Sequence, residues 1–140
     1  AYELAKLNQD IYNAPSVFNY FSPGYVVPGF GVNGPEFQIY TPYTSVYRDN
    51  MVSGLFSAYN SNINRNGPGT IVDLTPFIPL AANPSTLVDA LDLTLTNGLA
   101  PSAFESILVN AVTAETGGNL RRVQTALYLM LASSYYNVWN

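Results

Sequence analysis

The strongest pattern in this sequence is a helical repeat of apolar residues across its last third. The spacing predicts one helix from Pro84 with Asn83 as its N-cap, a second from Ser102, and a third from Asn119 to about Tyr136. The apolar positions that define these helices are Leu87, Val88, Leu91 and Leu95; Phe104, Ile107, Leu108, Ala111 and Val112; and Leu120, Val123, Leu127, Met130 and Leu131. The links between them are short, so we expect successive helices to pack as antiparallel neighbours.

Residues between these helices favour the same boundaries. Gly98 suits the C-terminal cap of the first helix, and Gly117-Gly118 is expected to end the second. Ser102 and Glu105 have the spacing of a capping box, which predicts that Ser102 caps the second helix.

The first half of the chain predicts two further helices. An apolar face within residues 1–13 predicts a short helix, and Thr41-Pro42 predicts the start of a longer one that runs to about Tyr59. Residues 71–80 should be extended, because two prolines interrupt them. The apolar positions of the two helices are Leu4, Leu7 and Ile11, and Tyr43, Val46, Tyr47, Met51, Leu55 and Tyr59.

The segment from Pro15 to Tyr43, here called the aromatic segment, has a different character. It holds eight aromatic residues, five prolines and four glycines in 29 residues, with Glu36 as its one charge. So many rings are unusual in a solvated loop, and so many breakers exclude a long regular element. We therefore expect an ordered, irregular and largely buried segment with several tight turns, briefly extended at residues 37–40.

Together these patterns predict a mostly α fold of four to five helices in an irregular antiparallel bundle, wrapped by the aromatic segment. The length of 140 residues suits a single domain, 1–140. Within it, residues 1–43 would supply the short helix and the aromatic segment, and residues 44–140 the helical part. The rings would fill grooves between helices, which offsets the cost of ordering an irregular loop.

The composition excludes several classes of function but does not identify one. Charged residues make up 10% of the chain and its net charge is −4, so no basic surface exists for nucleic acid or anionic lipid. No apolar run is long enough for membrane insertion. The sparse charge suggests an extracytoplasmic protein or a surface covered by further protein. The chain has no histidine and no cysteine, which removes the commonest general base and all thiol chemistry, and we expect no cofactor.

The aromatic segment is similar to a block of the bacterial family catalogued as domain of unknown function 1800. That block reads roughly PSVFxWFSPxYxPPG followed by PEFQ, and here Tyr20 stands where tryptophan is more usual. The residues that carry the resemblance are Pro15 to Pro23, Tyr25, Pro28, Gly29 and Pro35 to Ile39, then Asp73 to Thr75, Leu87 to Asp89, Asn97 to Leu99, Arg122, Val123 and Ala126 to Leu129. The serine and tyrosine pairs at 133–136 replace a Ser-Pro-Glu-Tyr that is common in the family. The resemblance implies that the chain is the C-terminal part of a longer exported bacterial protein, and it carries over no catalytic residue.

Three groups of polar residues have spacings that bear on a site. Asn62, Asn64, Asn66, Gly67 and Asp73 fall at spacings of a calcium-binding loop, but the neutral ligands favour a plain turn-rich loop, so no metal site is expected. Asp89 and Asp92 are three apart on a predicted helix, and a catalytic pair is the weaker interpretation because no polar cluster accompanies them. Arg48 and Asp49 are adjacent and would not face each other on a helix, and a structural ion pair of Arg48 or Glu36 is favoured over a site.

A further candidate group is aromatic. Tyr135, Tyr136 and Trp139 would lie at the end of the last helix, where exposed rings could stack on a glycan. The alternative is that these rings pack against other protein. The preferred function is therefore a non-catalytic structural or interaction module of a larger protein, whose partner is the remainder of its own chain, or a glycan or another cell-surface protein. The alternatives are a carbohydrate-binding module or one wall of an enzyme cleft.

Overall fold

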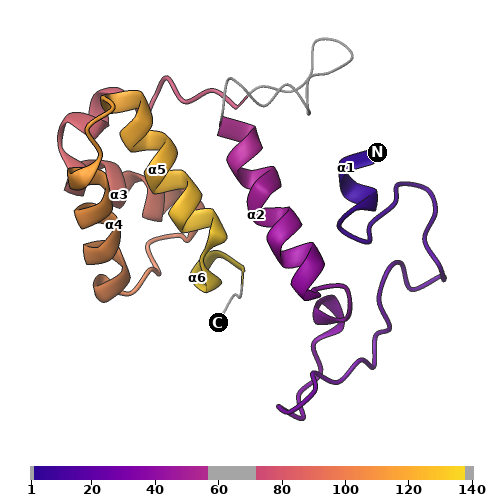
Figure 1. The fold of residues 1–140 in the computed structure, drawn as a ribbon. Helices are drawn as coiled ribbons and strands as arrows, with labels where there is room; N and C mark the ends of the chain where they lie inside the picture. Colours follow the sequence, from indigo (N-terminus) through magenta and orange to yellow (C-terminus); the bar gives the residue numbers. More distant parts are fainter. Residues whose placement is uncertain (1, 57–71, 138–140) are drawn as a thin grey trace. The chain divides into compact units, whose positions relative to one another are not determined.

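The computed structural model describes residues 2–56 and 72–137 of the chain. Its α-helices are α1 (Tyr2–Ala5), α2 (Pro42–Phe56), α3 (Pro84–Leu95), α4 (Ser102–Ala114), α5 (Asn119–Ala132) and α6 (Ser134–Asn137), and two 3-10 helices lie at Pro35–Gln38 (η1) and Pro79–Ala82 (η2) (Figure 1). The described residues contain isolated β-bridges but no strand. The prediction of a mostly α fold is confirmed.

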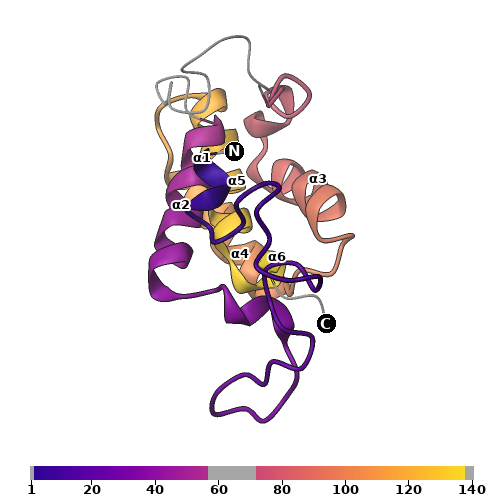
Figure 2. The ribbon, with the colours of Figure 1, turned by 90° about the vertical axis from the view of Figure 1, so that its right-hand side faces the viewer.

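The chain divides into two compact units, Ala1–Met51 and Val52–Asn140. The larger unit holds the hydrophobic core. Its helices α3, α4 and α5 pack against one another, and η2 packs on α3 and α5 (Figures 1 and 2). The core residues of this packed group are Leu74, Ala81, Leu87, Val88, Leu91, Leu108, Val112, Val123, Ala126, Leu127 and Met130.

The start of α3 follows the sequence prediction. The Asn83 side-chain oxygen accepts hydrogen bonds from the backbone nitrogens of Ser85 at 3.2 Å and Thr86 at 3.5 Å, and Pro84 occupies the first turn. Asparagine is a strong N-cap because its side chain satisfies amides that the helix leaves unpaired.

The predicted caps of α4 and α5 are wrong. Pro101 occupies the N-cap of α4, and no side chain caps that helix, so Ser102 and Glu105 do not form a capping box. Asn119 is the first residue of α5 rather than its cap; Gly118, at φ 88°, holds the cap position. A glycine tolerates this left-handed backbone, which lets the chain turn sharply between the helices.

Two of the predicted core positions face outward. Ile107 is 60% exposed and Leu120 is 46% exposed, whereas Leu108, Val112 and Val123 are fully buried. The helices α4 and α5 therefore each bury a narrower stripe than the apolar pattern suggested.

The last helix is also interrupted. The helix α5 ends at Ala132 because Ser133 has an extended backbone at φ −74° and ψ 157°. The Ser133 hydroxyl oxygen then accepts a hydrogen bond from the Tyr136 backbone nitrogen at 3.4 Å, at the start of the short helix α6. The expected continuous helix to Tyr136 is thus two helices.

Two polar side chains on α5 form hydrogen bonds that link separate elements of the larger unit. Arg122 donates from Nε to the carbonyl of Glu115 at 3.2 Å and from Nη1 to the carbonyl of Ala81 at 3.2 Å, which joins α5 to the end of α4 and to η2. Gln124 donates to the carbonyl of Phe56, at the end of α2. These bonds connect parts of the chain that are far apart in sequence.

A buried carboxylate orders the turn between α3 and α4. Asp92 is 5% exposed, and its Oδ1 accepts hydrogen bonds from the Thr96 hydroxyl and from the Ala100 backbone nitrogen, the latter at 3.0 Å. Asp89, three residues earlier, is exposed. The two carboxylates therefore lie in different environments and do not form a pair.

In the smaller unit, the first helix is shorter than predicted. It ends at Ala5, and Asn8 adopts a left-handed backbone at φ 59°. The amide of Asn8 bonds to the carbonyl of Ala5, and the amide of Gln9 bonds to the carbonyl of Leu4, both near 3 Å. This pair of bonds is a Schellman motif, in which asparagine replaces the usual glycine. Ile11 lies beyond the helix and is exposed.

The aromatic segment is irregular, as predicted, with turns at residues 22–25 and 27–30. Residues 35–38 form η1 rather than extended chain. The expected burial of its large side chains is wrong: Phe18 is 60% exposed and Phe30 is 79% exposed, and Val17, Val26, Val32, Phe37, Tyr40 and Tyr43 are exposed as well. That this segment wraps the bundle stays a prediction.

The start of α2 is confirmed. The Thr41 hydroxyl accepts from the Thr44 backbone nitrogen at 3.2 Å, and the Thr44 hydroxyl oxygen accepts from the Thr41 backbone nitrogen at 2.7 Å. The expected apolar face is only partly buried, because Tyr43 and Val46 are exposed while Thr44 and Val52 are buried. The prediction that residues 71–80 are extended is wrong for residues 75–80, which form a turn followed by η2.

Candidate functional site

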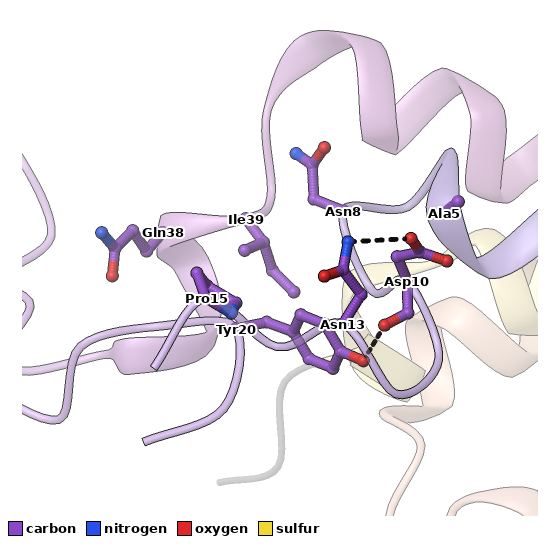
Figure 3. Close-up of a pocket in the computed structure, with 8 residues that line it drawn as sticks. All are labelled: Ala5, Asn8, Asp10, Asn13, Pro15, Tyr20, Gln38 and Ile39. Atoms are coloured by element: carbon purple, nitrogen blue, oxygen red, sulfur yellow. Dashed lines mark hydrogen bonds between the residues drawn. The ribbon is translucent and has the colours of Figure 1, made fainter. Parts of the chain in front are cut away.

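A pocket of about 400 Å³ lies in the smaller unit, beside the end of α1 (Figure 3). Its polar lining comes from the turn that follows α1 and from Tyr20 and Gln38 of the aromatic segment, and its apolar lining mostly from both ends of that segment. The lining residues are Ala5, Asn8, Asp10, Asn13, Pro15, Tyr20, Gln38 and Ile39. Three of the eight lie within six residues of one another in a tight turn, so local backbone geometry places the polar groups.

The turn is held by its own side chains. The Asn13 backbone nitrogen donates to the Asp10 carbonyl at 3.1 Å, and Asn13 Nδ2 donates to Asp10 Oδ2 at 3.2 Å. The side chain of Asp10 thus has one oxygen engaged with Asn13. Its other oxygen has no hydrogen-bond partner among the residues that the structure describes, and neither does the side-chain amide of Asn8.

Tyr20 ties the aromatic segment to this turn. Its hydroxyl donates to the Asp10 backbone carbonyl, so the ring is fixed at the pocket wall (Figure 3). Ile39 is half-buried on the apolar side. The backbone nitrogen of Ser22 donates to Gln38 Oε1 at 2.6 Å, which restrains that amide and leaves its nitrogen as a donor.

The rings predicted as a glycan site are not brought together as a platform. Tyr135 is 47% exposed, and its ring packs on Phe104 with centroids 4.8 Å apart and planes tilted by 40°. Tyr136 is half-buried. Trp139 lies outside the described residues. The Tyr135 ring therefore packs on Phe104 within the larger unit, which leaves less of it to stack on a sugar.

The residues with the spacing of a calcium-binding loop lie mostly outside the described part of the chain. Asn62, Asn64, Asn66 and Gly67 lie outside the described residues. Asp73 is exposed, and its Oδ1 accepts from the Thr75 backbone nitrogen at 2.9 Å. Hydrogen bonds from the Thr75 side chain and backbone hold the pKa of Asp73 below its ordinary value.

Arg48 and Asp49 do face each other, contrary to the prediction. Arg48 Nη1 lies 3.8 Å from Asp49 Oδ1, because a long arginine side chain can fold back over its neighbour. The contact is at the outer limit of an ion pair and partly exposed, so it contributes little to stability. It has the character of a structural contact rather than of a site.

Neither a family model, nor a curated protein, nor a solved structure matches this chain. Within residues 2–56 and 72–137, no three metal-ligating side chains gather at one point. None of the helices in that part of the chain combines the length and the hydropathy of a membrane span.

The pocket is the feature that sequence reasoning missed. The sequence feature that corresponds to the pocket is a group of three Asn or Asp residues, Asn8, Asp10 and Asn13, ahead of Pro15. Such residues also favour plain turns. What the sequence could not reveal is that Tyr20 returns to bond Asp10 and closes one side of the turn.

Proposed function

We propose that this chain is a non-catalytic interaction module, and that the aromatic segment is the surface that binds its partner. The observation that carries the proposal is the exposure of large apolar side chains along this segment, led by Phe18 and Phe30. Exposed apolar surface on this scale marks interaction sites, because leaving it in water costs free energy that a partner would recover.

The partner we propose is an apolar protein surface, the remainder of a longer polypeptide. The resemblance described above supports this choice, since family members are longer exported bacterial proteins of which this chain would be the C-terminal part. The low charge of the chain is also consistent with a surface that other protein covers.

Two observations support a non-catalytic role. The sequence lacks histidine and cysteine. The carboxylates considered as a pair are separated, with Asp92 buried and bonded to Thr96 and Ala100.

A binding experiment tests the proposal. The chain would be titrated by calorimetry with the separately produced remainder of its natural polypeptide. Phe18→Ser and Phe30→Ser should each weaken binding by at least about tenfold, because each removes an exposed ring whose burial by the partner is worth roughly 1.5–3 kcal/mol. Ile107→Ser, which removes an equally exposed apolar side chain from α4, is the matched control and should change binding little.

Three results would overturn the proposal. One is a natural polypeptide that begins and ends where this chain does. Another is binding that Phe18→Ser and Phe30→Ser leave unchanged. The third is substrate turnover by the chain alone in a hydrolase screen.

A further inference from the structure

We infer that the pocket beside α1 is a binding site for a neutral sugar, a pyranose or a short saccharide. The pocket shares Pro15, Tyr20, Gln38 and Ile39 with the aromatic segment but none of that segment's exposed rings, and the inference does not depend on the proposed partner. It also differs from the predicted glycan site at Tyr135 and Tyr136, which lies in the other unit.

The polar wall offers both donors and acceptors. One Asp10 oxygen and the Asn13 side-chain oxygen can accept, and the Asn8 amide can do both, since the bonds within the turn use only Asp10 Oδ2 and one hydrogen of Asn13 Nδ2. The Tyr20 O–H already donates its hydrogen bond to the Asp10 carbonyl, so toward a ligand the oxygen can act only as an acceptor. Adjacent sugar hydroxyls each donate and accept, which matches this alternation of groups.

The apolar wall suits the other side of a sugar ring. Pro15 and Ile39 lie on one side of the pocket and Asp10 and Asn13 on the other, and the Tyr20 ring reaches from the first side to the Asp10 carbonyl (Figure 3). A pyranose carries C–H groups on its faces and hydroxyls around its edge, so a site with one apolar and one polar wall holds it in one orientation. Because the hydroxyl of Tyr20 is already bonded, little side-chain entropy is lost when the ligand enters.

Charge and size narrow the ligand class. Asp10 is the one ionisable acid among the lining residues, and no lysine or arginine lines the pocket, so phosphorylated, sulfated or acidic ligands would meet no counter-charge. A hard metal ion wants several carboxylates, and this pocket offers one. The volume of about 400 Å³ lies at the lower end of the range for small-molecule sites, which fits one or two sugar rings.

The test is a titration of the ¹⁵N-labelled chain followed by two-dimensional NMR. The probes are the methyl glycosides of glucose, galactose, mannose and N-acetylglucosamine, each to about 100 mM, since single sugars bind weakly to open sites. We expect at least one glycoside to shift the amide signals of residues 8–20 and 38–39 in a saturable way. No saturable shift with any of the four, or shifts confined to residues 134–137, would overturn the inference.

A pair of variants tests whether the polar wall binds the sugar. Asn13→Ala should weaken binding roughly tenfold by removing a polar contact. Asn50→Ala, which removes an exposed amide from α2, is the matched control and should leave affinity within about twofold.

A third variant separates a sugar site from a cation site. Asp10→Asn keeps the shape and an acceptor oxygen, so a neutral sugar should lose affinity only a few-fold, roughly the difference between a charged and a neutral hydrogen bond. If methylammonium binds at these residues more tightly than the glycosides and Asp10→Asn abolishes that binding, the site is a cation site and the inference is wrong. The dispersion of the NMR spectrum shows whether each variant is folded. If Asn13→Ala does not fold, the affinity of Asp10→Asn for the glycosides and for methylammonium tests the inference instead.

Discussion

The buried carboxylate of Asp92 makes the most direct test of how the larger unit is held together. In the variant Asp92→Ala, the Thr96 hydroxyl and the Ala100 amide both lose their acceptor at Oδ1. Asp92 is 5% exposed, so water cannot easily replace the missing oxygen. The Ala100 amide is then left without an acceptor, whereas the Thr96 hydroxyl keeps the Asp92 backbone carbonyl, 3.0 Å away, as an alternative acceptor.

The magnitude follows from the two bonds. A hydrogen bond to a charged group contributes about 1.5–3 kcal/mol, so two give an upper range of about 3–6 kcal/mol. The carbonyl that remains for Thr96 and relaxation of the loop toward solvent should recover part of this, and we expect a loss near 3 kcal/mol. For a unit of this size that corresponds to a fall in melting temperature of roughly 12–24 °C.

The assay is urea unfolding followed by far-ultraviolet circular dichroism, with hydrogen exchange of the Ala100 amide as a local probe. Asp92→Asn keeps an acceptor oxygen for both donors and should cost less, about 1–1.5 kcal/mol. Asp89→Ala removes the same charge from an exposed position of the same helix, so it should lie within about 0.5 kcal/mol of the parent. The reasoning is refuted if Asp92→Ala is no more destabilising than Asp89→Ala, or if Ala100 exchange does not accelerate.

Three further predictions concern stability. Leu108→Ala should destabilise by about 2–5 kcal/mol in urea unfolding because the side chain is fully buried, whereas Ile107→Ala beside it should cost much less; equal losses would contradict the observed orientation of α4. Arg122→Lys keeps the charge but cannot reach two separate carbonyls, so it should cost about 1.5–3 kcal/mol, while Arg121→Lys at the exposed neighbouring position should be neutral in the same assay. The folded pKa of Asp73 is depressed, so its stabilising effect is present above the unfolded pKa of about 4 and is lost as pH falls through the folded pKa. The difference in melting temperature between the parent and Asp73→Asn should therefore shrink below pH 4, and a difference that grows there would contradict the assigned sign.

Much of the helical fold could be predicted from local signals. Asn83-Pro84 and Thr41-Pro42 mark helix starts because their capping chemistry is contained in a few neighbouring residues. Errors arise where tertiary context decides. Ser102 and Glu105 have the spacing of a capping box, yet Pro101 takes the cap position. Ile107 fits the helical period and still faces solvent, because the pattern cannot say how wide the buried stripe is.

The candidate site could not be predicted, for a related reason. Three of its polar residues come from one turn, but its other walls depend on Tyr20 and Ile39, which lie further along an irregular segment. Such a segment has no hydrophobic periodicity, so the sequence alone does not predict which of its side chains lie next to the turn. The same limit applies to the rings at Phe18 and Phe30: the abundance of rings suggests burial, and only the structure shows these two exposed.

The long-range hydrogen bonds of Arg122 and Gln124 on α5 have a consequence for the folding and unfolding rates of the larger unit. The helices α3, α4 and α5 contact their neighbours in the chain through short links, so their pairing closes small loops and should be fast. The bonds from Arg122 to Ala81 and from Gln124 to Phe56 span 41 and 68 residues, so we expect them to form after the transition state. Contacts of that kind slow unfolding without speeding folding. The lifetime of the folded unit would then be set largely by two side chains on α5, and the rate of its formation by the apolar faces of the helices.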